Sequence, residues 1–93
     1  MSGRVRTVEI LRFLQLDEAG VLEALRSEGL FLEDEIEPEV AEDLRVAASL
    51  MRELGVNPAG VDVVLHLRRR LACLEDRMRE LLEHLADEID RGR

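Results

Sequence analysis

Residues 57–85 read NPAGVDVVLHLRRRLACLEDRMRELLEHL, which is the longest regular apolar pattern in the chain. Asn57 followed by Pro58 is a typical helix start, because Asn caps free amides and Pro fits the first helical turn. Apolar residues then recur three and four residues apart through three heptads, which is the spacing of a coiled-coil seam. We call these residues the seam: Val64, Leu67, Leu71, Leu74, Met78, Leu81 and Leu85. One long C-terminal helix is therefore predicted over residues 57–93.

The seam is too long for the rest of the chain to cover. At 1.5 Å of rise per residue it extends over ~32 Å, whereas the preceding residues predict only short helices. We expect a second copy of the chain to cover its distal part, in a homodimer whose helices pair either parallel or antiparallel. The alternative is that the last helix folds back onto its own domain.

Two short helices are predicted near the N-terminus. Thr7 can cap a first helix that ends at about Leu14, and Asp17 can cap a second over residues 18–28. Gly29 follows as a helix stop. The two residues between these helices are a typical spacing for a helix-turn-helix.

A third helix is predicted from Pro38, which suits a first turn, to Gly55, which ends it. Its apolar residues form one stripe, consisting of Val40, Leu44, Ala47, Met51 and Leu54. The predicted fold is therefore all-α. A helix-turn-helix-like domain over residues 1–56, with a reduced or absent wing, joins the C-terminal coiled-coil helix over residues 57–93 in one compact unit.

The segment from Phe31 to Asp43 contains seven carboxylates and no base. They are Glu33, Asp34, Glu35, Glu37, Glu39, Glu42 and Asp43. DNA binding depends on neutralising phosphate with Lys and Arg, and the chain has a formal net charge of −8. A local basic face would still suffice for DNA. The acidic segment could also be a solvated connector that only keeps the protein soluble.

Neither catalytic nor metal chemistry is indicated by the sequence. His66 and His84 lie about 27 Å apart along one helix, so they cannot share a ligand within one chain. Cys73 is the only cysteine, and no Gly-rich phosphate loop is present. We expect no enzyme activity, no cofactor and no metal. Nothing approaches the ~20 apolar residues of a membrane span, and no secretory signal is recognisable, so a cytoplasmic location without membrane attachment is expected.

Three segments resemble the helix-turn-helix of the MerR class. They are TVEIL at 7–11, EGL at 28–30 and LMRELGVN at 50–57. The segment ELGVNPAGV at 53–61 is similar, more narrowly, to the CbpM-like chaperone modulators and the related DnaK–DnaJ assembly factors. The resemblance covers about residues 6–85. It implies a non-enzymatic protein that binds the J domain of a DnaJ-type co-chaperone and regulates or assembles the Hsp70 heat-shock system.

The chain departs from the DNA-binding members of that class where they contact phosphate. Those members have an Arg-Tyr-Tyr stretch shortly before EGL and Arg in the wing, whereas here residues 23–25 read EAL and residues 33–35 read EDE. Each such change replaces an attraction to phosphate by a repulsion. Only Arg12 and Arg26 remain as bases that could contact phosphate there. A MerR-like transcriptional regulator that binds DNA as a dimer is the alternative function.

The resemblance implies that an acidic surface with apolar anchors binds a basic helix of the J domain, with Hsp70 as a further candidate partner. Charge complementarity would speed the encounter, and apolar contacts would supply affinity. The predicted contact residues are Asp17, Glu18, Glu23, Leu30, Phe31, Leu32, Glu33, Asp34, Glu35, Ile36 and Glu37.

Overall fold

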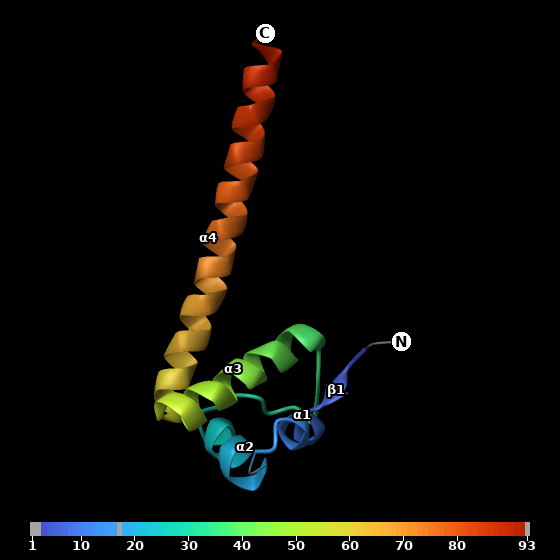
Figure 1. Ribbon diagram of the computed structural model, residues 1–93, viewed down its shortest axis with the longest axis vertical. Helices are drawn as coiled ribbons and strands as arrows, with labels where there is room; N and C mark the ends of the chain where they lie inside the picture. The colour runs from blue at the N-terminus through green and yellow to red at the C-terminus, as the bar shows by residue number, and fades with distance from the viewer. Residues whose placement is uncertain (1–2, 17, 93) are drawn as a thin grey trace.

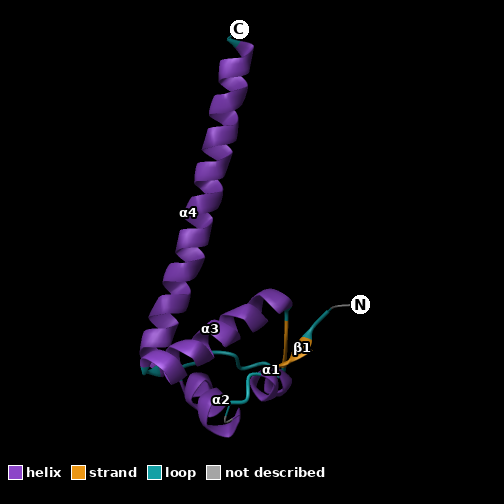
Figure 2. Ribbon diagram, viewed as in Figure 1, coloured by secondary structure: helices purple, strands orange, loops and turns teal. Residues whose placement is uncertain are grey.

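The computed structural model describes residues 3–16 and 18–92. Its elements are β1 (Val5–Arg6), α1 (Thr7–Phe13), α2 (Glu18–Ser27), β2 (Glu35–Ile36), α3 (Pro38–Leu54) and α4 (Pro58–Arg91). The fold is all-α as predicted, because four helices contain most of the described chain and each strand has only two residues (Figure 2). Residues 3–65 form a compact head, from which the rest of α4 projects (Figure 1).

The core of the head is built from one apolar side of each helix. Leu11 of α1, Leu25 of α2 and Leu44 of α3 are completely buried, as the amphipathic spacing requires. Val61 and Leu65 close the core from the first turns of α4. The apolar stripe predicted along α3 is buried in its middle and exposed at both ends, since Val40 is 37% exposed and Leu54 is 72% exposed.

The helix ends follow the local signals of the sequence. Gly29 and Gly55 have φ angles of 80° and 67°, and each follows the helix that it was predicted to stop. Asn57 caps α4 as predicted, because its side-chain oxygen accepts a hydrogen bond of 2.8 Å from the amide of Gly60. The predicted cap at Asp17 lies outside the described residues.

Thr7 does not cap α1, so that prediction is wrong. It is the first residue of the helix, and Arg6 occupies the cap position without a side-chain cap bond. The Thr7 side chain is fully buried, and its hydroxyl donates to the carbonyls of Glu33 and Asp34 at 2.8 and 3.1 Å. The Thr7 amide also donates to the Asp34 carbonyl, at 2.8 Å. Thr7 therefore fastens α1 to the acidic connector, residues 31–37.

The connector contains a short strand in the place where a wing was expected to be reduced or absent. Strand β2 pairs antiparallel with β1, with Val5 opposite Ile36 and Arg6 opposite Glu35. Ile36 is 4% exposed and belongs to the core. The connector is thus attached to the head at its strand and through Thr7.

Helix α4 leaves the head after its second turn. Leu65 is 1% exposed, whereas Leu67 is 60% exposed, and every described residue from His66 to Gly92 is exposed. The molecule consequently measures 61 × 33 × 21 Å (Figure 1). Arg68 still contacts the head, through an ion pair with Asp43 at 3.3 Å. The alternative in which α4 folds back is excluded, and the expected compact unit is compact only in its head.

Candidate protein-binding surfaces

The seam forms an uncovered apolar face along α4. Val64, at the edge of the head, is half-buried, and the six later seam residues are between 52% and 70% exposed. Three further apolar residues of α4, Val63, Leu82 and Ile89, are also more than half exposed. At 3.6 residues per turn they lie within about 60° of the middle of the seam, so they widen this face and lengthen it. The sequence prediction did not include them, because a heptad pattern assigns only one apolar residue to the seam in every three or four positions.

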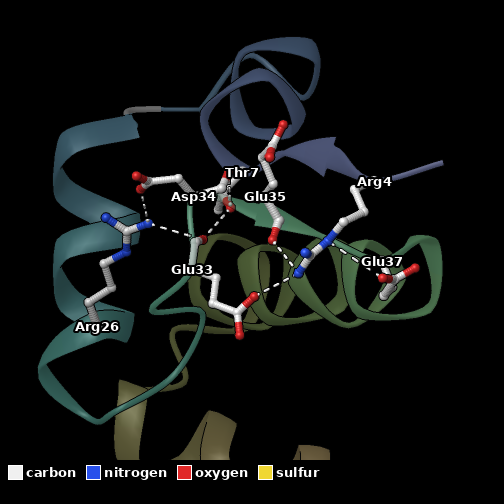
Figure 3. Close-up of polar contacts among 7 residues, drawn as sticks. All are labelled: Arg4, Thr7, Arg26, Glu33, Asp34, Glu35 and Glu37. Atoms are coloured by element: carbon white, nitrogen blue, oxygen red, sulfur yellow. Dashed lines mark hydrogen bonds and ion pairs between the residues drawn. The ribbon is translucent and has the colours of Figure 1, made fainter. Parts of the chain in front are cut away.

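The acidic connector is neutralised in part by arginines that are distant in sequence. Arg4 forms ion pairs with Glu33 at 2.8 Å and with Glu37 at 3.5 Å, and Arg26 pairs with Asp34 at 3.2 Å (Figure 3). The segment itself contains no base, so the sequence indicates no ion-pair partner for its carboxylates. The pairing of β1 with β2 carries Arg4 across the connector, and this could not be read from sequence spacing.

Arg26 also organises the backbone of the connector. Its Nε donates to the carbonyl of Phe31 at 2.8 Å, and a terminal nitrogen donates to the carbonyl of Glu33 at 3.3 Å. Phe31 has a left-handed backbone with a φ angle of 53°, which turns the chain out of α2 into the connector. Arg26 is therefore engaged by the connector through hydrogen bonds and an ion pair.

The connector carboxylates remain accessible despite these pairs. The side chains of Glu33, Asp34 and Glu37 are all more than half exposed, and exposed ion pairs contribute only ~0–1 kcal/mol. A partner's base can therefore replace Arg4 or Arg26. Among the described residues Glu35 has no ion-pair partner, and Figure 3 shows its carboxylate directed away from both arginines.

The predicted apolar anchors differ in their availability. Leu32 is 62% exposed and lies between the partly buried Phe31 and the exposed Glu33. Leu30 and Phe31 are half-buried and pack against the core. Ile36 is a core residue because β2 directs it inward, so its prediction as a contact residue is wrong.

The remaining predicted contact residues come from α2. Glu23 is exposed on this helix. Glu18 is the first residue of α2, but its side chain is outside the described part of the structure, as is the whole of Asp17.

A second apolar surface on the head was not predicted. Phe13 at the end of α1 is 86% exposed. It borders a groove of about 480 Å³ between α1 and the start of α3, lined mainly by Ile10, Leu14, Pro38 and Ala41. Phe13 was missed because it falls outside the apolar side of α1 that contains Leu11. Its exposure is visible only in the fold, where none of the described residues covers this side chain.

The rim of that groove contains the Glu42–Arg45 pair. Two hydrogen bonds of 3.0 and 2.6 Å join the guanidinium to the carboxylate. These bonds lower the pKa of Glu42 below its ordinary value, and they raise the pKa of Arg45. The pair is fully ionised at neutral pH and gives the rim both charges.

Other binding chemistries find no support in the described part of the chain. No three metal-ligating side chains gather there, and His66 is occupied locally, with Nδ1 lying 2.9 Å from the Asp62 carbonyl oxygen. Cys73 is exposed on α4, and no helix among the described residues is long and apolar enough to cross a membrane.

No family model, curated protein or solved structure matches this chain.

Proposed function

We propose that this chain is a non-enzymatic chaperone modulator or adaptor that binds the J domain of a DnaJ-type co-chaperone and thereby regulates or assembles the Hsp70 (DnaK) system. The observation that carries the proposal is the exposed Leu32 among accessible carboxylates, on a head whose sequence resembles the CbpM-like modulators. This surface offers both contacts that a basic amphipathic helix needs, an apolar anchor and acidic groups around it.

The contact surface proposed for the J domain comprises the exposed part of the connector and the adjacent side of α2. Leu32 supplies the main apolar contact, because Ile36 is buried in the core. The acidic groups are Glu23, Glu33, Asp34, Glu35 and Glu37. These carboxylates attract a basic helix at a distance and then exchange Arg4 or Arg26 for the partner's bases. Hsp70 would be reached through the co-chaperone.

Two copies of the chain are proposed to pair through α4. A monomer would expose the seam together with Leu82 and Ile89, which is an unusually long apolar face for a free helix. Burying it against the same face of a second copy removes the face from water without involving the connector. The adaptor is therefore a homodimer with one J-domain surface on each head.

The alternative, a dimeric DNA-binding regulator, has less support. Arg26 is committed to the Phe31 carbonyl and to Asp34, and Glu23 stands on the same helix. We expect no specific binding to the protein's own promoter region at about 150 mM salt. Capture of genomic fragments followed by gel shift measures this, and one site bound at nanomolar affinity would overturn the adaptor.

The J-domain proposal is tested by binding kinetics with a purified J domain at low and high salt. Leu32→Ala should mainly speed dissociation, because it removes an apolar contact without touching the core. Replacing Glu33, Asp34, Glu35 and Glu37 by Gln or Asn should slow association and weaken its salt dependence. Leu54→Ala, which truncates an exposed leucine at the C-terminal end of α3, is the matched control and should leave both rates unchanged. Unchanged rates for the Leu32 and connector variants would refute this surface.

A further inference from the structure

A pocket of about 380 Å³ is lined by the connector and the first turn of α3. Its apolar lining consists of Phe31, Leu32, Ile36 and Val40. Leu32 and Val40 are 62% and 37% exposed, whereas Ile36 belongs to the core and so fixes the pocket to the head. An apolar side chain of a partner that enters this pocket would exchange water for contacts with Leu32 and Val40. The pocket is therefore a place for an apolar anchor of a partner.

Three charged side chains, Arg4, Glu33 and Glu37, also line this pocket. The Nη2 of Arg4 donates to the Glu33 carboxylate at 2.8 Å and to the Glu35 carbonyl at 3.2 Å (Figure 3). Its Nε lies 3.5 Å from the Glu37 carboxylate. One guanidinium thus bridges both carboxylates, and the chain supplies its own cation to the pocket.

The Arg4 side chain can leave the pocket while the head stays folded. It is 39% exposed, and exposed ion pairs contribute little to stability. The pairing of β1 with β2 involves Val5 and Arg6, so it does not depend on the Arg4 side chain. Arg26, by contrast, donates its Nε to the Phe31 carbonyl at 2.8 Å and so supports the turn between α2 and the connector. Arg4 is therefore the more readily exchanged of the two arginines.

The acceptors around the pocket define the cation that fits it. Both carboxylates and the Glu35 carbonyl are engaged by different nitrogens of one planar guanidinium. The compact ammonium of a lysine cannot reproduce this fork. On a helix, residues three or four positions apart lie on the same side, so an arginine and an apolar residue at this spacing would reach the acceptors and the apolar lining together. The ligand that fits is a helix with these two side chains one turn apart.

We propose that this pocket binds an arginine and a neighbouring apolar side chain of a partner helix, and that Arg4 occupies the arginine position in the free chain. This inference rests on the function proposed above, and it adds the two side chains that the partner contributes and a competitor within the chain. Because the partner binds only molecules whose pocket is open, Arg4 lowers the apparent affinity. Val40 becomes a contact residue together with Leu32.

Removal of the competitor tests the proposal, with the full-length chain and a purified J domain of a DnaJ-type co-chaperone as the probe. Arg4→Ala should bind about fivefold more tightly than the native chain, because the pocket is then open in every molecule. Arg52→Ala is the matched control. It removes the same charge at ~21 Å of helical rise from Pro38, so it measures what net charge alone contributes.

The outcomes separate this inference from the function on which it rests. If the native chain binds the J domain but Arg4→Ala gains no more affinity than Arg52→Ala, the competitor is overturned and J-domain binding stands. If neither the native chain nor Arg4→Ala binds, both proposals are overturned. Circular dichroism during heating should show that Arg4→Ala retains the cooperative transition of the head.

The two side chains of the partner give a second readout. Each arginine on the basic helix of the J domain is changed singly to lysine, which keeps the charge and removes the fork, and one of these exchanges should weaken binding. Val40→Ala should speed dissociation about threefold while α3 persists, because Ala is the better helix former. Leu54→Ala, at the other end of α3, is the control. An affinity that no exchange to lysine lowers, or an unchanged dissociation rate for Val40→Ala, would overturn the pocket as the contact.

Discussion

Leu65 and Leu67 lie two residues apart on one helix, yet Leu65 is buried in the head and Leu67 is open to water. The two regions differ in whether another helix covers them, because the leucine spacing is helical in both. In the head, four helices of one chain cover each other's apolar sides. Beyond residue 66, α4 has an equally regular apolar side and no other element beside it (Figure 1). Amphipathic periodicity therefore predicts burial, but it does not say which chain provides the other surface.

Leu44→Asp should have the largest effect, because it places a carboxylate in the completely buried centre of the head. The expected loss exceeds about 4 kcal/mol, which is comparable with the whole stability of a small domain. Far-ultraviolet circular dichroism during heating should show loss of the cooperative transition. A variant that melts like the native chain would mean that Leu44 is not in a core.

The same substitution at the seam should act on association instead of folding. Leu74→Asp, or Met78→Asp, would bury a charge in the seam of each helix and should dissociate the dimer, while the head retains its cooperative unfolding. Light scattering at micromolar concentration measures the mass. If the native chain is already monomeric, or if the variant remains dimeric, α4 does not pair through this face.

Thr7→Val should have an intermediate effect, confined to the head. The exchange conserves shape but removes the hydroxyl that bonds the carbonyls of Glu33 and Asp34. A loss of about 1–3 kcal/mol is expected, since the interaction is buried. Urea unfolding checks this value. Thr7→Ser keeps the hydroxyl and should retain more stability than Thr7→Val, and equal losses for both would exclude the hydrogen bonds as the cause.

The smallest effect is expected at the exposed Glu42–Arg45 pair. Because hydrogen bonding lowers the pKa of Glu42 in the folded chain, the pair stabilises the fold above the ordinary pKa of 4.5 and loses this contribution as pH falls through the lowered value. The native chain should therefore exceed Glu42→Gln slightly in stability at neutral pH, and the two should converge in acid. Urea midpoints across this range measure the difference, and a constant difference would contradict the titration of Glu42.

Much of the fold could be predicted because its signals are local. Pro38, Gly55 and the Asn57–Pro58 pair mark helix ends through their own backbone chemistry. The errors concern tertiary contacts. A Thr side chain can cap a helix, but the connector lies so close to Thr7 that the Glu33 carbonyl accepts the hydrogen bond of its hydroxyl. Arg6 occupies the cap position instead.

The candidate site was predicted less well, because charge and exposure there depend on distant segments. The connector looked uniformly acidic in sequence, and only the β1–β2 pairing shows that Arg4 lies across it. Ile36 has the same apolar character as Leu32 and lies in the same segment, but one is a core residue and the other is exposed. Phe13 was missed for the converse reason, since it falls outside the apolar side of its helix and still forms the edge of an apolar groove.

Binding of a J domain by the head can be measured directly by sedimentation velocity. The chain would be mixed with the purified J domain of a DnaJ-type co-chaperone at about 150 mM salt. A species heavier than two 10.6 kDa chains, containing both proteins, is predicted, and Leu32→Ala should reduce its amount. If the J domain and the chain sediment separately at concentrations well above micromolar, the adaptor function is contradicted.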